Sequence, residues 1–131
     1  MILPITTLYA APLALLFLVL WTLATKARAG AHLSIGHGDN MNLLLWIRRH
    51  GNFTEWVPMV LILMALAELN GVGPIWLHVA GLLLLTGRIL HPIGLLADRA
   101  VTFGRIYGNS APFAAVLVLL LGLALLALRG A

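Results

Sequence analysis

Four long apolar segments, with few charges inside them, restrict what this 131-residue chain can fold into. A helix needs about 20 mainly apolar residues to cross a bilayer, so each segment predicts a membrane-spanning helix, and the spans cover about residues 4–25, 42–69, 74–97 and 106–128. Of all residues, 62% are apolar and 9% charged, and little chain lies outside the spans, which excludes a separate soluble catalytic domain. The sequence predicts one domain, an all-α membrane protein built as a four-helix bundle.

The second segment differs from the others because its polar residues gather at its beginning, which reads NLLLWIRRHGNFTE. At about 1.5 Å per residue the helix is roughly 42 Å long, more than the roughly 30 Å of hydrocarbon requires. We therefore expect its first turns to lie in the headgroup layer. Pro58 removes a backbone donor in mid-span and predicts a kink.

The basic residues are placed unevenly along the chain, which has 8 Lys+Arg against 4 Asp+Glu. The turn near residues 70–73 and the N-terminal segment have none, whereas basic residues flank the first and third connections: Lys26, Arg28, Arg99 and Arg105. The positive-inside rule therefore places both connections in the cytoplasm and both termini outside, with Arg129 as the exception. The net charge of +4 in so apolar a chain favours anionic lipids or an anionic ligand as partners over nucleic acid.

Polar side chains inside the second and third spans form two stripes. On an ideal helix Arg48, Asn52 and Glu55 lie within about 60° of one another, and Arg88 and His91 share a face of the third span. Charges at membrane depth are costly and need a partner, a cavity or a function. Both stripes belong to the cytoplasmic half, so the sequence predicts a cationic pocket that opens there.

Internal pairing is the simplest alternative, with Glu55 bound to Arg88 or Arg48 as polar glue between helices. The arginines near the pocket nevertheless outnumber the nearby acids Glu55 and Asp98: they are Arg28, Arg48, Arg49, Arg88 and Arg105. An anionic ligand would neutralise the excess, and a guanidinium holds a carboxylate in two hydrogen bonds.

Other motifs predict structure more than chemistry. The chain has no cysteine, which excludes disulfides and a cysteine nucleophile, so a thiol must arrive with a ligand. The histidines have no metal-binding spacing, and we predict no metal site. IGHGDN is typical of a turn, with Asn40 or Asn42 capping the next helix. Gly104 and Gly108 form a GxxxG that lets helices approach closely, and Glu68 is interpreted as a solvated helix end.

Three stretches together suggest a family. RRHGNFTEWVP at residues 48–58, GRILHPIGL at residues 87–95 and the arginine at the start of the fourth span resemble the MAPEG family, the membrane-associated proteins in eicosanoid and glutathione metabolism. The likeness spans nearly the whole chain and is greatest to the short bacterial members, which implies a bacterial inner membrane. It also implies a homotrimer that binds glutathione between subunits near the cytoplasmic face.

The resemblance also assigns roles to residues. It implies that glutathione is held by Arg48, which meets a carboxylate, by Asn52, and by Glu55, which accepts from the glutamyl ammonium. Arg88 and His91 would line the pocket, and Arg28 would approach from an adjacent subunit. Arg105 would lie against the sulfur and favour the thiolate. That thiolate would attack a small hydrophobic electrophile or reduce a lipid hydroperoxide delivered from the bilayer, so the resemblance implies a glutathione transferase or peroxidase.

The sequence departs from this pattern in two places. Relatives have a tyrosine shortly after the third-span histidine, where this chain has PIGL, and Tyr107 is the candidate to replace it. Gly51 stands where some relatives have another arginine. These departures keep open a non-catalytic scaffold that binds lipid or a small anion in the same pocket. A four-helix multidrug transporter fits less well, because residues 1–25 lack the acidic residue that such transporters have in their first helix.

Overall fold

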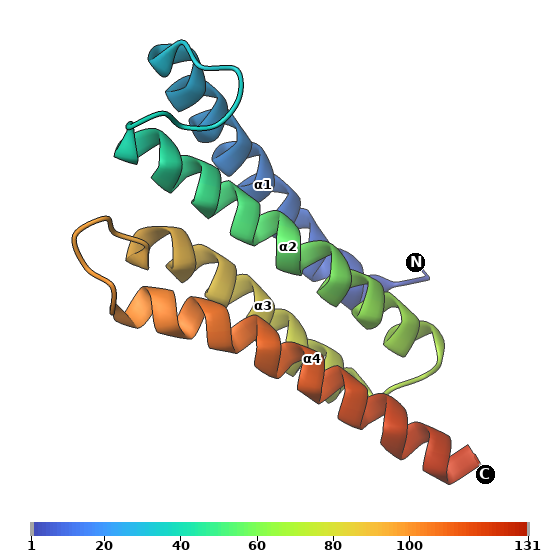
Figure 1. Cartoon of the computed structure of the whole chain (residues 1–131). Helices are drawn as coiled ribbons and strands as arrows, with labels where there is room; N and C mark the ends of the chain where they lie inside the picture. The colour runs from blue at the N-terminus through green and yellow to red at the C-terminus, as the bar shows by residue number, and fades with distance from the viewer. Residues whose placement is uncertain (1, 131) are drawn as a thin grey trace.

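The computed structural model describes residues 2–130, with side chains for residues 2–128, and over these residues the chain forms four helices (Figure 1). They are α1 (Pro4–Ala31), α2 (Met41–Leu69), α3 (Pro74–Gly94) and α4 (Phe103–Gly130). Each is long and apolar enough to cross a membrane, which confirms the predicted all-α four-helix membrane bundle. α1 runs further than the predicted span, to Ala31, because the polar residues after position 25 continue the helix beyond its apolar part.

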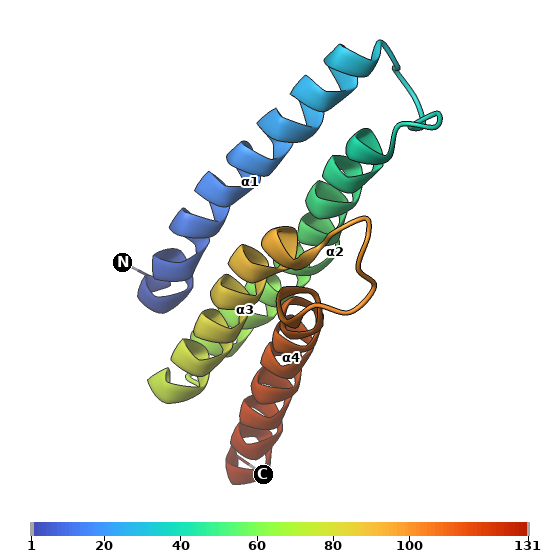
Figure 2. The ribbon, with the colours of Figure 1, turned by 90° about the vertical axis from the view of Figure 1, so that its left-hand side faces the viewer.

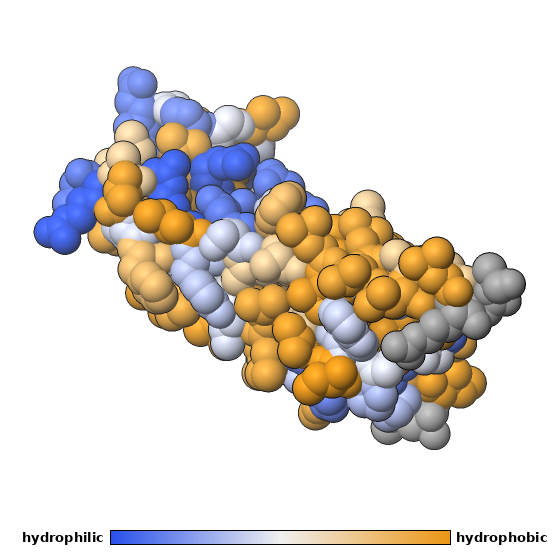
Figure 3. Space-filling model, turned by 90° about the horizontal axis from the view of Figure 1, so that it is seen from below, coloured by the Kyte–Doolittle hydropathy of each residue, from blue (hydrophilic) through white to orange (hydrophobic). Residues whose placement is uncertain are grey.

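The helices alternate in direction, so the molecule has two distinct ends (Figures 1 and 2). The connections 32–40 and 95–102 lie together at one end, which we call the polar end. The two termini and the short α2–α3 turn lie at the other, which we call the terminal end. Hydrophilic residues gather at the polar end and apolar residues cover much of the remaining visible face (Figure 3). Within the described residues α2 contacts every other helix, whereas α1 and α4 do not contact each other.

Local sequence signals explain where the helices begin. The Asn40 side chain accepts from the Leu43 N–H at 3.0 Å and caps α2, as predicted. Pro74 occupies the first turn of α3, where its missing N–H costs nothing. The Thr102 hydroxyl caps α4 by accepting from the Arg105 N–H at 3.2 Å. α2 continues through Pro58 without a break.

Glycines bring α3 and α4 into close contact. A Cβ added at Gly94 would lie 2.4 Å from the backbone nitrogen of Arg105, and one at Gly108 would lie 2.5 Å from the His91 Cβ. Gly104 likewise has room for no Cβ, since the Leu90 oxygen would be 2.7 Å away. The predicted GxxxG therefore serves a contact within the chain, and it fixes the height of His91 relative to Arg105.

Glu68 corrects one expectation from the sequence. It is half-buried and not a solvated helix end: its two carboxylate oxygens accept the backbone N–H groups of Ile5 and Thr6, each at 2.8 Å. The first N–H groups of a helix have no partner inside the helix and attract negative charge, so Glu68 caps α1 from across the bundle. The interaction could not be read from α2 alone, because it depends on where the start of α1 lies.

Candidate functional site

A cavity of about 330 Å³ opens at the polar end between α2, α3 and α4. This volume lies within the range of roughly 300–1,000 Å³ typical of small-molecule sites. Apolar side chains form part of its wall, and the polar lining consists of Arg48 and Asn52 from α2, His91 from α3, and Arg105 and Asn109 from α4. Residues from both predicted stripes and from the start of the fourth helix therefore meet in one cavity, which we call the polar cavity.

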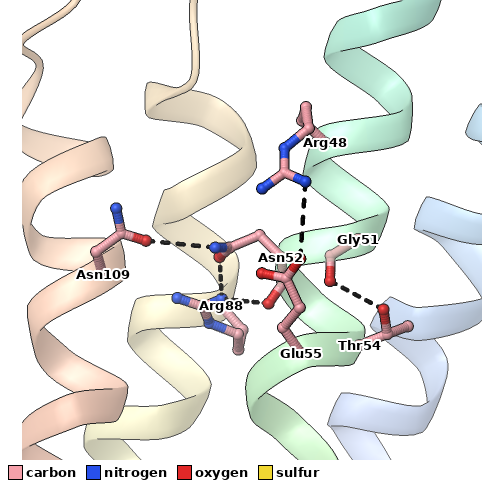
Figure 4. Close-up of polar contacts among 7 residues, drawn as sticks. All are labelled: Arg48, Gly51, Asn52, Thr54, Glu55, Arg88 and Asn109. Atoms are coloured by element: carbon pink, nitrogen blue, oxygen red, sulfur yellow. Dashed lines mark hydrogen bonds and ion pairs between the residues drawn. The ribbon is translucent and has the colours of Figure 1, made fainter.

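The polar cavity is cationic. Among the described residues that line it there are two arginines and no acidic side chain. Arg48 lies 3.7 Å from Glu55 in an ion pair whose side chains are 56% and 53% exposed (Figure 4). A pair this exposed holds its partners weakly, by about 0–1 kcal/mol, so Arg48 remains available to an anion.

Arg105 lines the cavity from the first turn of α4. Its guanidinium donates from Nη1 to the carbonyl of Ala100 at 2.7 Å, while the Thr102 cap holds its backbone. Asn109 follows one turn later on the same face, about 40° away around the helix. The sequence analysis did not select Asn109, although its spacing of four residues from Arg105 was the signal that identifies it.

Arg88 has a different place from the one expected. It is 1% exposed and lies behind Asn52, outside the residues that line the cavity. Its guanidinium donates to the backbone oxygen of Asn52 at 3.1 Å and to the Asn52 Oδ1 (Figure 4). It also donates to the Gly108 carbonyl, so Arg88 joins α2, α3 and α4. Within the described residues no carboxylate lies within 4.0 Å of it.

The contact with Arg88 also sets the orientation of the Asn52 amide. A guanidinium can only donate, so the Asn52 oxygen must face Arg88 and the Asn52 Nδ2 must face away from it. That Nδ2 lies 3.5 Å from the Asn109 Oδ1 (Figure 4). The buried arginine therefore turns an amide donor toward the cavity.

Besides Arg88, three predicted site residues lie outside the described lining of the cavity of their own chain. They are Glu55, whose contact with the lining is its ion pair with Arg48, and Arg28 and Tyr107. Arg28 donates to the carbonyls of Leu33, Ser34 and Gly36 at 3.1–3.3 Å and closes the loop after α1. The Tyr107 hydroxyl lies 2.8 Å from the Thr86 hydroxyl, and its ring stacks on another aromatic ring of α4, so it does not replace the missing third-helix tyrosine in the cavity. The role of Arg28 was implied by the resemblance, and Tyr107 was chosen because it lies two residues after Arg105. Neither argument gives the direction in which the side chain points in this bundle.

The fold and the cavity together define a class: a polytopic membrane protein with an anion-attracting cavity at one end of its helices. The chain matches the MAPEG family over residues 6–125 and belongs to that family. It is also 32% identical over 117 residues to the inner membrane protein YecN of Escherichia coli K12, covering 89% of this chain and 88% of that protein. YecN from Escherichia coli O6:H1 matches to the same extent. No solved structure matches the chain significantly.

These comparisons confirm the family that the three sequence stretches suggested. They also agree with the four apolar helices, so the chain is an integral inner membrane protein of the MAPEG family. Among the residues with described side chains, no group of three His, Asp or Glu residues lies close enough together to hold a metal ion.

Proposed function

We propose that this protein is a glutathione-dependent transferase or peroxidase that acts on hydrophobic electrophiles or lipid hydroperoxides. The observation that carries the proposal is the polar cavity, in which Arg48, Asn52, His91 and Arg105 meet without an acidic neighbour in the described lining. Membership of a family of glutathione and eicosanoid metabolism supports this ligand over other small anions.

The chemistry of glutathione complements the cavity together with Glu55, which lies outside the described lining and pairs with Arg48 of that lining. Its γ-glutamyl end carries an ammonium beside a carboxylate, and Arg48 and Glu55 offer the opposite pair of charges 3.7 Å apart. Arg48 would hold the carboxylate in a charge-assisted contact and Glu55 would accept from the ammonium. The amides of Asn52 and Asn109 would bond the peptide groups, with His91 forming the wall beside them.

Arg105 would act on the sulfur. A free thiol with a pKa near 8.5 is only a few per cent ionised at pH 7, and an adjacent guanidinium favours the thiolate. The proton leaves to solvent, and the sulfur lone pair forms a bond to an electrophilic carbon as its leaving group departs with the bonding electrons. With a hydroperoxide, two glutathiones supply two electrons, yielding an alcohol, water and glutathione disulfide.

The proposal includes an assembly and an orientation. A homotrimer would bring Arg28, which does not reach the cavity of its own chain, toward the cavity of a neighbouring subunit. The polar end would face the cytoplasm, where glutathione is available, and both termini would lie outside. The basic connections support this orientation through the positive-inside rule.

Binding and turnover by the purified full chain test the proposal. In detergent it should bind glutathione at millimolar concentration and conjugate an aryl halide. Arg105→Ala should keep binding within a few-fold and lose about 10²-fold in kcat, the size of losing one preorganised charge-stabilising donor. Arg99→Ala is the matched control, because that arginine has a side chain 71% exposed and lies outside the cavity. Absence of glutathione binding would exclude the proposal.

A second function remains a specific alternative, a non-catalytic scaffold that binds lipid or a small anion in the same cavity. It is favoured by the missing tyrosine after His91 and by Tyr107, whose hydroxyl bonds Thr86 instead of facing the cavity. Under this alternative glutathione binds without turnover, and the pKa of its bound thiol equals that of free glutathione.

A further inference from the structure

A second concave surface lies between α1, α2 and α3, and its α2 residues differ from those that line the polar cavity. It has a volume of about 370 Å³. Its walls are Leu16, Leu20 and Leu23 of α1, Trp46 and Arg49 of α2, and Ile89, Pro92 and Ile93 of α3. We call it the α1–α3 groove. No residue that lines it lines the polar cavity, so it is a separate site.

The groove is apolar except at one end. Arg49 is the one charged residue in its described lining, and its guanidinium stacks over the Trp46 ring with 4.5 Å from Cζ to the ring centroid. Its Nη2 donates to the carbonyl of Leu95 at 2.9 Å, directly after the end of α3. Arg49 therefore lies level with the end of the α3 span, where the hydrocarbon gives way to headgroups.

From that level the groove runs toward the middle of the membrane. Leu23 and Leu16 are seven residues apart on α1, which corresponds to about 10 Å along the helix, most of one leaflet's hydrocarbon. Figure 2 shows α1 continuing past the end of α3 toward the polar end. Ile89 and Ile93 are 45% and 69% exposed, so the wall formed by α3 is open to the acyl chains.

Arg49 lacks an acidic partner within 4.0 Å among the described residues, and its Nε has no hydrogen-bond partner. The chain itself has few carboxylates to offer, even from a second copy, because it contains only four acidic residues. Glu68 caps α1, and Glu55 and Asp98 pair with Arg48 and Arg99. The fourth acid, Asp39, is exposed in the connection 32–40. The missing counter-charge must therefore come mainly from outside the protein.

We propose that the α1–α3 groove binds an anionic glycerophospholipid of the leaflet at the polar end, with its phosphate on Arg49 and one acyl chain along Leu16, Leu20 and Leu23. The order of the groove matches such a lipid, since the cation lies at headgroup depth and the apolar wall extends from it toward the midplane. A guanidinium suits phosphate because its donors form a planar fork. Basic pockets between spanning helices recognise anionic headgroups by the same chemistry.

Native mass spectrometry of the detergent-solubilised full chain tests this proposal. Phosphatidylglycerol and phosphatidylcholine with identical acyl chains are titrated separately. Both carry the phosphate, but the choline cation of phosphatidylcholine offsets its charge beside Arg49, so phosphatidylglycerol should bind about tenfold more tightly, which is about 1.4 kcal/mol. Arg49→Gln should lose this preference. Arg99→Gln removes the same charge from an exposed loop position and should keep it. Equal binding of both lipids, or retention of the preference by Arg49→Gln, would overturn the proposal.

A second variant protects the test if Arg49→Gln proves unstable in thermal melts. Ile93→Trp fills the groove while leaving Arg49 in place, so it should weaken phosphatidylglycerol binding at least as much; unchanged binding contradicts the groove as the site. Inorganic phosphate should not displace the bound lipid, because it lacks the acyl chain.

The chain lacks cysteine, so Ile93→Cys gives a unique probe. Rapid disulfide formation between copies through this probe would make the groove a subunit interface and reject the lipid.

Discussion

The two ends of the bundle use polar residues in opposite ways. At the terminal end every oxygen of the Glu68 carboxylate has a backbone N–H partner from α1, and the Tyr9 hydroxyl lies 3.1 Å from the His78 Nδ1. At the polar end Arg48 has only an exposed, weak ion pair, Arg105 bonds one carbonyl, and both line a cavity. The first set of contacts is complete within the chain, whereas the second has charge left over.

This difference separates structural from ligand-binding polarity in a membrane bundle. A charge whose hydrogen bonds are satisfied inside the protein joins helices, as Glu68 does, and needs no other partner. Charges that gather around a cavity without a counter-ion stabilise the fold little and lower their energy when an anion arrives. Arg88 shows that closeness to the polar end does not by itself make a charge available to a ligand. It is 1% exposed, and its Nη1 and Nη2 donate to oxygens of α2 and α4.

The largest loss of stability is expected from replacing Arg88, the buried arginine that joins helices near the polar end. Arg88→Met removes the donors that satisfy the Asn52 and Gly108 oxygens and should destabilise the protein by about 2–4 kcal/mol, since buried acceptors without partners cost about 1–3 kcal/mol each. It should also weaken glutathione binding, because the Asn52 amide is then free to turn. Thermal unfolding in detergent measures the first effect and equilibrium binding the second. If Arg88→Met keeps full stability, Arg88 does not join the helices.

A somewhat smaller effect is expected from Gly94→Ala. The added Cβ would meet the backbone nitrogen of Arg105 at 2.4 Å, so α4 must shift and stability should fall by about 1–3 kcal/mol. The same shift moves Arg105, and turnover should fall with it. Gly51→Ala is the matched control: its Cβ meets nothing within 4 Å, and the helix should gain about 0.5–1 kcal/mol. Equal melting behaviour of the two variants would contradict close α3–α4 packing.

The smallest loss of stability is expected from replacing one glutamate at each end of the bundle, which compares the two ends directly. Glu68→Gln removes the charge that caps α1 and should lower stability by about 1 kcal/mol while glutathione binds unchanged. Glu55→Gln should do the reverse, leaving stability within about 1 kcal/mol because its ion pair is exposed, and weakening glutathione binding. The two variants are compared by thermal melts and by glutathione titration. Loss of binding in Glu68→Gln would show that the ends are not independent.

The sequence predicted the helices well because membrane hydrocarbon demands about 20 apolar residues for each span. It also brought Arg48, Asn52, His91 and Arg105 to one site, since helical spacing gives the face of each helix and the connections give the end. Spacing does not give the rotation of one helix against another. For this reason Arg88 was expected in the cavity and is behind it, and Tyr107 bonds Thr86.

Glu68 and the groove at Arg49 were missed for a related reason. Their partners are the start of α1 and the end of α3, which are far away in the sequence and come close only in the folded bundle. A hydropathy profile treats Glu68 as the polar end of a span and Arg49 as a headgroup-facing charge. Contacts between helices decide which of these charges is satisfied inside the protein.

Ionisation of bound glutathione tests the central claim most directly. Thiolate absorbance of glutathione bound to the purified protein is followed against pH in the native chain and in Arg105→Ala. We expect the pKa of the bound thiol to be lower than in free glutathione by about one unit or more, the effect of one adjacent opposite charge, and to return toward the free value in the variant. A bound thiol with the pKa of free glutathione in the native chain would contradict the assignment of Arg105.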